Sequence, residues 1–552
     1  MNGCQSKKFV VALAVATFSC ATFGVTTLYK SGKFGGKTLD DPTAYGREAF
    51  PSDGFEIILY YQNDANTPYS LADDFVLYRL YFHSFCYNTI HFPGKTLTGT
   101  NSVWVCEDSR ITMTGGRIVT PEFHMESTKY NIPEHRKTSF VMNGAEAEIE
   151  ATTVKVGVNW PYSSMIVSNG TCIGAFDLGE GNASASNCML RIVGPGSSWR
   201  VRAGSSNYAG AGGWYNVFSA ENGATVSVGD NANVYMGYDI GWGYGGGNEN
   251  RFVVDNSTFA ATNANFDLYG ANSNRLELVN GTRAAIKRVR IGARSQHGSK
   301  NAENGKRCVG NVFRVAGVGT LADVGSFVVG WQDADKGMLV VEDGARLYST
   351  NRITLNGNIV GYARAANNRL VVRSGGQLIA SWLELGYETN SKTNVLEIEN
   401  GTCRVTVKAP NQSSTASLVM SRGEANSSGT GWGNMILMKG TNSYLKSNYT
   451  ILRDNVAFEI PADGLADAKK TEAVMDLETL ATFSALVTVD VDGGCPKGKW
   501  KLMSWSSAPA GATDVSNYRI VGGGAWRSKL VFEGNAVYLD VKSDNGMMLI
   551  YR

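Results

Sequence analysis

The feature that most constrains this chain is an eight-residue frame that recurs along its middle. In three copies the frame starts with Asn, has apolar residues at its third and fifth places and ends with Gly: Asn274–Gly281, Asn368–Gly375 and Asn394–Gly401. It also fits Asn216–Gly223 and Gly337–Gly344. Looser copies start at Ser163, Asn187, Asn250, Asn311 and Asn434. The copies follow one another at about 24 to 40 residues, a spacing typical of solenoid repeats.

Each copy carries a second arm, in which two apolar residues flank one variable residue and a Gly follows. Examples are Phe176–Gly179, Val234–Gly237, Val289–Gly292 and Leu383–Gly386. Alternation with a period of two predicts strands with one buried face, and Asn or Gly at the ends of an arm tolerates the positive φ that a sharp corner needs. A unit of two or three short strands cannot bury its own apolar face, so neighbouring units must stack.

The sequence therefore predicts an all-β chain folded as a right-handed parallel β-helix, or β-solenoid, of roughly ten coils. In such a fold Leu276, Leu370 and Leu396 face a shared interior. The outward residue between the inward pair of the first arm is apolar in several copies, namely Val253, Val340, Val371 and Leu437. An apolar row on an outer face predicts cover by a long loop, a cap or a second subunit, which leaves oligomerisation open.

The chain divides into four segments. Residues 1–24 are predicted to be a signal peptide, because Lys7 and Lys8 precede a short apolar run and small residues. That run is short for a membrane-spanning helix, and no transmembrane segment is expected in the mature chain. Residues 25–135 are predicted to form an N-terminal cap and early coils, and 136–453 the solenoid repeats. Residues 454–552 are predicted to form a C-terminal β-rich cap with a helix at 472–480.

The segment LELGYETNSKTNVLEIENGT shows both arms together, and this alternation resembles the repeats of autotransporter passenger domains and related bacterial surface β-helices. The resemblance covers roughly residues 140 to 450 and concerns architecture. It implies an extracellular or cell-surface location and a role as adhesin, enzyme or spacer. The chain after the repeats is too short for the outer-membrane barrel of a classical autotransporter.

Composition removes several classes of function. A net charge of +2 gives no general attraction to nucleic acid, and none is expected as a partner. Removal of the signal would leave seven of nine cysteines, scattered and odd in number, which is no disulfide framework. Pairing of Cys86 with Cys106 stays open. The chain has no CxxC and no His/Cys metal spacing, so no metal and no cofactor is expected.

Charged residues were weighed as an enzyme site and as a polyanion site. Stacking places Asp267 beside Arg290 of the next coil, which predicts a solvated ion-pair ladder rather than the two carboxylates of a glycosidase. A polysaccharide lyase or glycoside hydrolase remains an alternative. A basic patch could bind an acidic glycan or be a solvated loop. It consists of Lys287, Arg288, Arg290 and Arg294.

Aromatic residues recur just after the second arm and in the Gly-rich connections that follow it. They are Trp214, Tyr215, Tyr238, Trp242, Tyr244, Trp331, Tyr362 and Tyr387. In a solenoid such positions line up in columns, which either stiffen a corner or offer flat faces to sugar rings. The predicted function is an exported binding or adhesin-like protein whose ligand is a polysaccharide or cell-surface glycan. A structural surface spacer is the other non-enzymatic alternative.

Overall fold

The computed structural model describes residues 25–31, 34, 36–52, 54–60, 68–83, 85–106, 108–126, 137–158, 160–179, 185–238, 247–269, 272–293, 308–330, 334–355, 367–386, 393–406, 417–421 and 433–543. The predicted signal peptide lies outside these residues. So do six of the predicted site residues: Trp242, Tyr244, Arg294, Trp331, Tyr362 and Tyr387.

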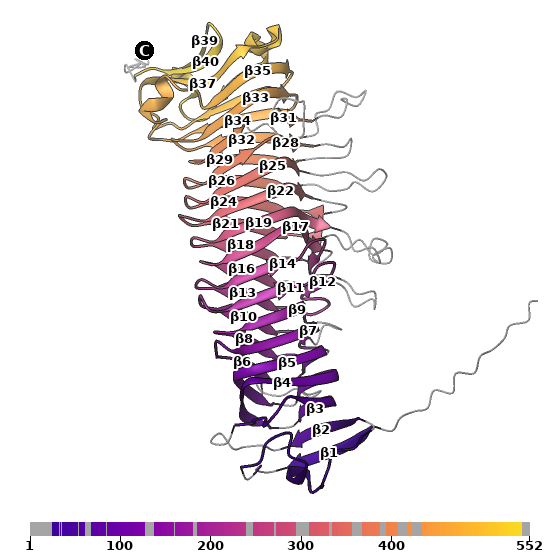
Figure 1. The fold of residues 1–552 in the computed structure, drawn as a ribbon. Coiled ribbons are helices and arrows are strands. Elements are labelled where there is room, and N and C mark those ends of the chain that lie inside the picture. Colours follow the sequence, from indigo (N-terminus) through magenta and orange to yellow (C-terminus); the bar gives the residue numbers. More distant parts are fainter. Residues whose placement is uncertain are drawn as a thin grey trace, which may run out of the picture.

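The described chain is an all-β solenoid in which parallel strands stack from the N-terminal to the C-terminal end (Figure 1). Each coil contributes a strand segment to a first, a second and a third sheet. The apolar-x-apolar frame that begins with Asn forms the first sheet, and the apolar-x-apolar-Gly arm forms the third. The predicted parallel β-helix is confirmed, and no α-helix occurs in the described ranges.

Strands of the first sheet are β6 (Ser139–Met142), β8 (Ser164–Val167), β10 (Met189–Val193), β13 (Val217–Glu221), β16 (Arg251–Asp255), β18 (Arg275–Val279), β21 (Val312–Ala316), β24 (Met338–Glu342), β26 (Arg369–Arg373), β29 (Val395–Glu399), β32 (Met435–Lys439), β34 (Asn455–Ile460), β36 (Leu486–Val491) and β38 (Tyr518–Val521). The second sheet alone holds β11 (Ser198–Val201), β14 (Thr225–Val228), β27 (Gln377–Ala380) and β30 (Thr402–Val405). The third sheet alone holds β12 (Ser206–Ala209), β15 (Asn233–Met236), β28 (Trp382–Leu385) and β31 (Ser417–Met420).

Longer strands bend from the second sheet into the third. They are β3 (Phe75–His83), β7 (Ala147–Val156), β9 (Thr171–Leu178), β17 (Thr258–Tyr269), β19 (Arg283–Ala293), β22 (Leu321–Val329), β25 (Arg346–Leu355), β33 (Tyr444–Leu452) and β35 (Met475–Phe483). Two strands run through all three sheets, β4 (Tyr87–Cys106) and β5 (Arg110–Glu126). A separate two-stranded pair consists of β20 (Cys308–Val309) and β23 (Ala334–Asp335).

The interior is a continuous apolar core that runs along the solenoid axis. Leu370 of β26 lies opposite Leu396 of β29, and Leu276 of β18 lies opposite Phe313 of β21. All four side chains are fully buried. The predicted shared interior is therefore confirmed.

A ladder of buried asparagines stands at the start of the first-sheet strands. The side-chain Oδ1 of Asn274 accepts a hydrogen bond from the backbone N–H of Asn250, at 2.9 Å. Asn311 accepts in the same way from Asn274, and Asn434 from Asn394. We expected this Asn to adopt the positive φ of the corner, and that expectation is wrong. The residue before it does so, for example Ser273 with φ 59°. The amide side chain instead satisfies a buried donor of the previous coil.

The other end of the frame behaves as predicted. Asn280 and Gly281 have φ of 55° and 88°, in the left-handed region. Two consecutive residues of this conformation reverse the chain between the first and second sheets.

The ends of the solenoid close differently. At the N-terminal end β1 (Thr26–Ser31) pairs in parallel with β2 (Phe55–Tyr60), and η1 (Pro42–Tyr45) lies between them in the chain. Parallel pairing continues past residue 453, through β34, β36 and β38. At the C-terminal end β40 (Ala536–Val541) pairs antiparallel with β37 (Gly498–Ser507) and β39 (Ser528–Glu533). Short 3-10 helices there are η2 (Asp467–Lys470), η3 (Ala510–Thr513), η4 (Val515–Asn517) and η5 (Ala525–Arg527).

The predicted helix at 472–480 is wrong. Residues Met475–Phe483 form β35, which pairs with β33 and β37. Met475 and Leu477 are fully buried, with Asp476 between them facing outward. Pairing on both edges outweighs the local helix preference of this segment, because strand formation depends mainly on tertiary partners.

The apolar row on the outer face of the first sheet is covered within the chain itself. Val340 and Val371 are only 5% exposed and lie opposite one another. Arg314 lies opposite Val340, and both Arg314 and Arg373 form ion pairs of 2.5 Å with Glu342. The aliphatic stems of these arginines lie along the face and cover the valines. Burial of the row therefore requires no second subunit.

Cys86 and Cys106 are both buried free thiols, so the disulfide left open above is not formed. The Cys86 Sγ donates to the backbone oxygen of Leu59 at 3.1 Å. In the described ranges no helix is long and apolar enough to span a membrane.

Candidate ligand-binding face

The outer face of the third sheet carries a row of aromatic and charged side chains in strict register. Adjacent strands of a parallel ladder lie about 4.8 Å apart, so equivalent residues of successive coils form a column. We call this column the third-sheet column. Its members, in order along the solenoid, are Tyr81, Trp104, His124, Lys155, Asp177, Tyr208, Tyr235, Asp267, Arg290, Val328, Thr354 and Glu384.

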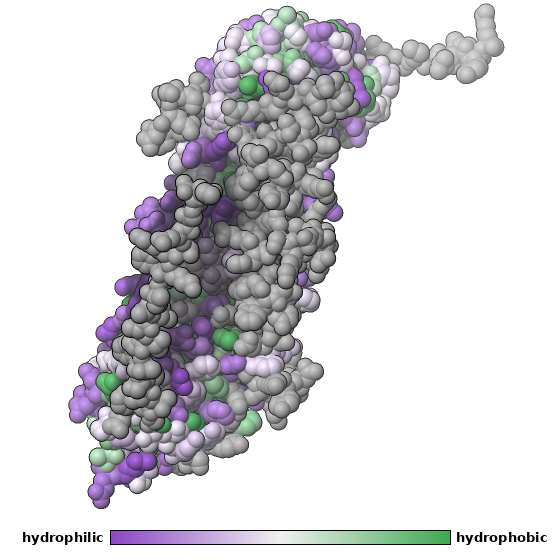
Figure 2. Space-filling view, turned by 90° about the vertical axis from the view of Figure 1, so that its right-hand side faces the viewer, coloured by the Kyte–Doolittle hydropathy of each residue, from purple (hydrophilic) through white to green (hydrophobic). Residues whose placement is uncertain are grey.

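The side of the solenoid on the right of Figure 1, where third-sheet strands end, faces the viewer in Figure 2. The described residues visible there are mostly hydrophilic, with small apolar patches between them (Figure 2). The column therefore belongs to a molecule whose surface on this side is largely polar.

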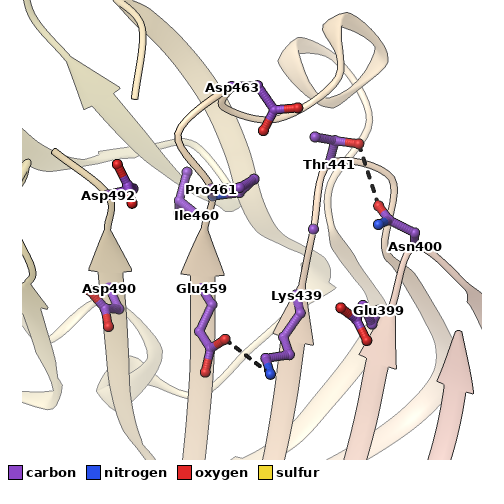
Figure 3. Close-up of a pocket in the computed structure, with 11 residues that line it drawn as sticks. Glu399, Asn400, Lys439, Thr441, Glu459, Ile460, Pro461, Asp463, Asp490 and Asp492 are labelled. Carbon is purple, nitrogen blue, oxygen red and sulfur yellow. Dashed lines mark hydrogen bonds and ion pairs between the residues drawn. The ribbon is translucent and has the colours of Figure 1, made fainter. Parts of the chain in front are cut away.

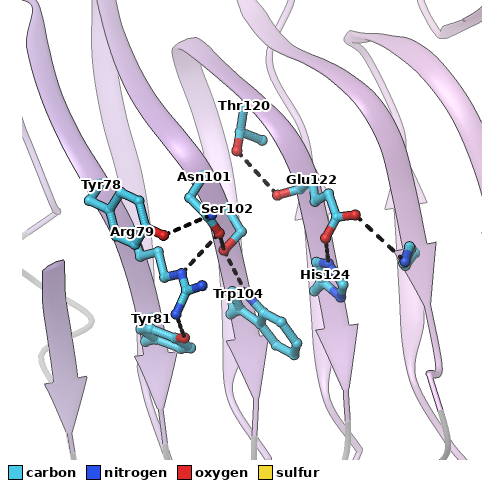
Figure 4. Close-up of polar contacts among 10 residues, drawn as sticks. Tyr78, Arg79, Tyr81, Asn101, Ser102, Trp104, Thr120, Glu122 and His124 are labelled. Atoms are coloured by element: carbon cyan, nitrogen blue, oxygen red, sulfur yellow. Dashed lines mark hydrogen bonds and ion pairs between the residues drawn. The ribbon is translucent and has the colours of Figure 1, made fainter. Parts of the chain in front are cut away.

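The column begins with three stacked rings (Figure 4). The rings of Tyr81 and Trp104 are 5.9 Å apart at an interplanar angle of 27°. The rings of Trp104 and His124 are 4.0 Å apart at 7°. His124 is buried, whereas Tyr81 and Trp104 are half-buried. The stack thus presents part of two aromatic rings to solvent and uses the imidazole as its inner support.

A hydrogen-bond network fixes the indole from the side (Figure 4). Trp104 Nε1 donates to Ser102 Oγ at 2.8 Å, and Ser102 donates to Asn101 Oδ1 at 3.1 Å. Arg79 Nε donates to the same oxygen at 2.9 Å, and Asn101 Nδ2 donates to the Tyr78 hydroxyl at 3.1 Å. Because each member is held by another, the rings have little freedom to reorient.

Glu122 links the stack to the next coil. Its carboxylate is 2.6 Å from His124 Nε2 and 3.7 Å from Lys155 Nζ. The hydrogen bond from His124 lowers the pKa of Glu122, with Lys155 adding to the effect. The carboxylate is therefore charged at neutral pH and bound between two basic groups.

Four tyrosines gather further along the third sheet; we call them the tyrosine cluster. Tyr208 and Tyr235 stack at 5.4 Å, and Tyr238 lies 5.3 Å from Tyr235. Tyr269 meets Tyr238 edge to face at 5.2 Å. Tyr269 is buried and the other three are half-buried. The cluster is thus an aromatic surface, with Tyr269 as its inner wall.

Asp267 and Arg290 adjoin this cluster. Arg290 Nε donates to Asp267 Oδ1 at 2.6 Å, which confirms the predicted contact between neighbouring coils. The predicted solvation is wrong, because the Asp267 side chain is fully buried. Burial raises the pKa of Tyr269 to about 12, with a smaller contribution from the charge of Asp267. A carboxylate in this setting balances its arginine and is not accessible to solvent.

The basic patch predicted from sequence is divided by the fold. Arg290 is occupied by Asp267. Arg288 lies in the adjacent outward column, opposite Asn265 and Ser326, and Lys287 is exposed. Burial and the neighbouring Arg290 lower the pKa of Arg288. Within the described chain, neither Arg288 nor Lys287 has a carboxylate partner.

A third group of the same composition lies near the C-terminal end of the column. Arg352 forms an ion pair with Glu384, whose side chain is fully buried. Trp382 Nε1 donates to the Glu384 carboxylate at 3.2 Å, and the Arg352 guanidinium lies 5.8 Å from the Trp382 ring. Aromatic rings beside a paired charge therefore recur along the face.

Three of the predicted aromatic site residues are described. Tyr238 belongs to the tyrosine cluster. Trp214 and Tyr215 are 40% and 48% exposed and lie in the connection between β12 and β13, away from the stacked rings. Sequence reasoning missed several aromatic residues of this face, because the frame is weak in the early coils and register between coils was unknown. They are Tyr81, Trp104, His124, Tyr208, Tyr269 and Trp382.

A separate cavity of about 560 Å³ opens at the end of first-sheet strands β29, β32, β34 and β36 (Figure 3). Lys439 lies 3.3 Å from Glu459 and 3.6 Å from Glu397. Burial alone would lower the pKa of Lys439, but Glu459 and its neighbours raise it. Among the described residues no group of three His, Cys, Asp or Glu side chains is arranged to hold a metal ion. Acidic residues of the lining are Glu399, Glu459, Asp463, Asp490 and Asp492.

Comparison with known proteins leaves the class of the chain to its fold. No protein-family model matches, and neither a curated protein nor a solved structure shows a match. The fold defines the chain as a parallel β-solenoid, and its densest group of surface aromatics lies on the third sheet.

Proposed function

We propose that this chain is an exported carbohydrate-binding β-solenoid and that the outer face of the third sheet holds the glycan. The observation that carries the proposal is the stack of Tyr81, Trp104 and His124 beside the polar network of Asn101 and Arg79. Sugar rings offer apolar C–H faces to aromatic rings and hydroxyls to amide and guanidinium groups. A half-buried, pre-oriented ring with polar groups at its edge suits such a ligand.

The repetition of the site favours a chain-like ligand. Aromatic groups recur at the Trp104 stack, at the tyrosine cluster and at Trp382. Each coil advances the column by about 4.8 Å, a spacing comparable to one sugar residue. A polysaccharide lying along the solenoid axis would meet these groups in succession, and their weak contributions would add through linkage.

Export and an adhesin-like role are the second part of this proposal. They rest on the signal-like residues at 1–24 and on the resemblance of the repeats to those of bacterial surface β-helices. A glycan of a cell surface or of a secreted matrix is the corresponding ligand.

Two alternatives remain for the test to separate. A polysaccharide-cleaving enzyme would need two carboxylates across one sugar bond. Glu122, Asp267 and Glu384 are instead each paired with a basic residue of this face. A structural spacer would bind no glycan.

The experiment is titration calorimetry of the mature chain with neutral and acidic polysaccharides, with assays for reducing ends and unsaturated products. Trp104→Ala should lower affinity about tenfold, in line with loss of one aromatic contact. Tyr348→Ala is the matched control, because Tyr348 is a half-buried aromatic of the second sheet. Thermal unfolding of both variants checks that they fold.

Three outcomes decide the matter. Binding that depends on Trp104 and not on Tyr348 supports the proposal. Products in the assays would make the chain an enzyme. Absence of binding to every polysaccharide, or equal losses in both variants, would overturn the proposed face.

A further inference from the structure

We infer that Arg288 and the tyrosine cluster form a subsite for the anionic group, carboxylate or sulfate ester, of an acidic sugar. This inference rests on the proposed function and names the class of glycan that the third-sheet face would take.

The charge count around β17 and β19 is unequal. Arg288 and Arg290 both point outward from β19, and their partners in register on β17 are Asn265 and Asp267. The only carboxylate of the four-residue group is Asp267, and Arg290 occupies both of its oxygens. On the following strand Ser326 lies opposite Arg288, so the arginine meets neutral neighbours on both sides.

Arg288 is moreover partly removed from water. Its Nε is buried and has no hydrogen-bond partner, and the side chain as a whole is half-buried. A guanidinium that has lost water without gaining an acceptor is unfavourable by itself, and an incoming anion would remove that penalty. Lys287, the preceding residue, is exposed and adds a second uncompensated positive charge to this strand.

The tyrosine cluster supplies the rest of a sugar site. Tyr235 lies opposite Asp267, one coil before Arg290, and stacks on Tyr208. Tyr238 is half-buried beside it. A ring lying on this surface would have its substituents within the field of Arg288, while phenol hydroxyls could donate to ring oxygens.

Guanidinium is suited to this recognition. Its planar fork binds the two oxygens of a carboxylate or sulfate together, and such charge-assisted bonds are about twice as strong as neutral ones. A neutral sugar at the same place would leave the Arg288 charge uncompensated. The face should therefore discriminate in favour of acidic chains.

The test uses pairs of polysaccharides that differ only in the anionic group. One arm compares polygalacturonate with its methyl ester, and the other compares dextran sulfate with dextran. Arg288→Gln is the test variant. Arg283→Gln is its matched control, since Arg283 is an exposed arginine of the same strand that faces outward from the second sheet.

We expect the parent chain to bind the acidic member of a pair at least about tenfold more tightly than the neutral one, as for a single charge-assisted contact. Arg288→Gln should remove most of that difference and leave the affinity for the neutral chain unchanged. Arg283→Gln should change neither. The arm in which the preference appears identifies the group as carboxylate or sulfate.

Each contrary result has a distinct meaning. Equal losses in the two arginine variants would show general charge attraction and would overturn the subsite. Trp104-dependent binding without any acidic preference would overturn the subsite and leave the proposed function standing. Absence of binding by all four polysaccharides would overturn both.

Discussion

The indole of Trp104 lies parallel to the imidazole of His124, with 4.0 Å between ring centroids and 7° between their planes. The two residues are 20 positions apart in the chain but occupy equivalent places on β4 and β5. His124 is buried beneath its neighbours and is bonded to Glu122 at 2.6 Å. The imidazole thus supports the exposed part of the stack and carries a charge-assisted contact at the same time.

These two roles can be separated by substitution. His124→Ala removes the ring beneath Trp104 and should weaken glycan binding about tenfold, because the indole loses its stacking partner. His124→Phe restores a ring of similar width without the bond to Glu122. It should bind within about threefold of the parent chain if ring support is what matters. Isothermal titration of both variants measures this, and equal losses would show that the bond to Glu122 governs the site instead.

Two tryptophans of neighbouring coils should respond in opposite ways to truncation. Trp199 is fully buried and its Nε1 donates to the Gly174 oxygen at 2.9 Å, so Trp199→Ala should cost about 3 to 5 kcal/mol. Trp214 is 40% exposed, and Trp214→Ala should change stability by no more than about 0.5 kcal/mol. Thermal unfolding compares the two. If Trp214→Ala also lowers glycan affinity, the connection after β12 belongs to the binding surface. A large stability loss at Trp214 would contradict the exposed placement.

The asparagine ladder should be sensitive to loss of a single amide. Asn394 Oδ1 accepts from both the backbone N–H and the Nδ2 of Asn368. Asn394→Ala would leave these buried donors without acceptors, which should cost about 2 to 4 kcal/mol. Asn442→Ala is the control, because Asn442 is exposed and takes part in the turn through its backbone N–H. Chemical denaturation of both variants measures the difference, and similar midpoints would argue against a stabilising ladder.

Two outward glutamates of β5 should give opposite pH dependence. Burial raises the pKa of Glu126 from 4.5 to about 7, offset in part by a hydrogen bond from Trp160. A folded-state pKa above the unfolded value means that the contribution to stability is full below pH 4.5 and is lost as pH rises through 7. Glu126→Gln should therefore be more stable than the parent chain at pH 8, by on the order of 1 to 2 kcal/mol.

Glu122 provides the matched comparison on the same strand. The hydrogen bond from His124 lowers its pKa, so its contribution is present above pH 4.5 and is lost as pH falls through the folded-state pKa. Glu122→Gln should be less stable than the parent chain at pH 7 and equal to it in strong acid. Unfolding midpoints at several pH values test both variants. Parallel curves for the two would contradict the opposite environments of these carboxyl groups.

Much of the fold could be predicted from local pattern. The alternation around Leu276, Leu370 and Leu396 sets which side chains face inward, because strand geometry has a period of two. The Asn-Gly ends, such as Asn280 and Gly281, indicate the corner because few residues accept positive φ. The segment at 472–480 was misjudged, since Met475 and Leu477 acquire their strand conformation from partners in other coils.

The candidate site was only partly visible in the sequence. The pairing of Asp267 with Arg290 followed from equivalent places in successive arms, and so did the outward direction of Tyr235. The Trp104 stack did not, because the early coils lack a clear frame by which to align their residues. Burial of Asp267 also depends on which side chains of adjacent coils close over it.

The sequence by itself determined the repeating strand, its inward face and the stacking of coils, because these depend on periodicity within a few residues. The tertiary structure alone decided the columns. The connections differ in length from coil to coil, so Trp104 and His124, or Tyr235 and Asp267, become neighbours only when hydrogen bonding sets the register. Column neighbours in turn decide charge and exposure, which is why Arg290 is neutralised by a buried carboxylate while Arg288 on the same strand is left without one.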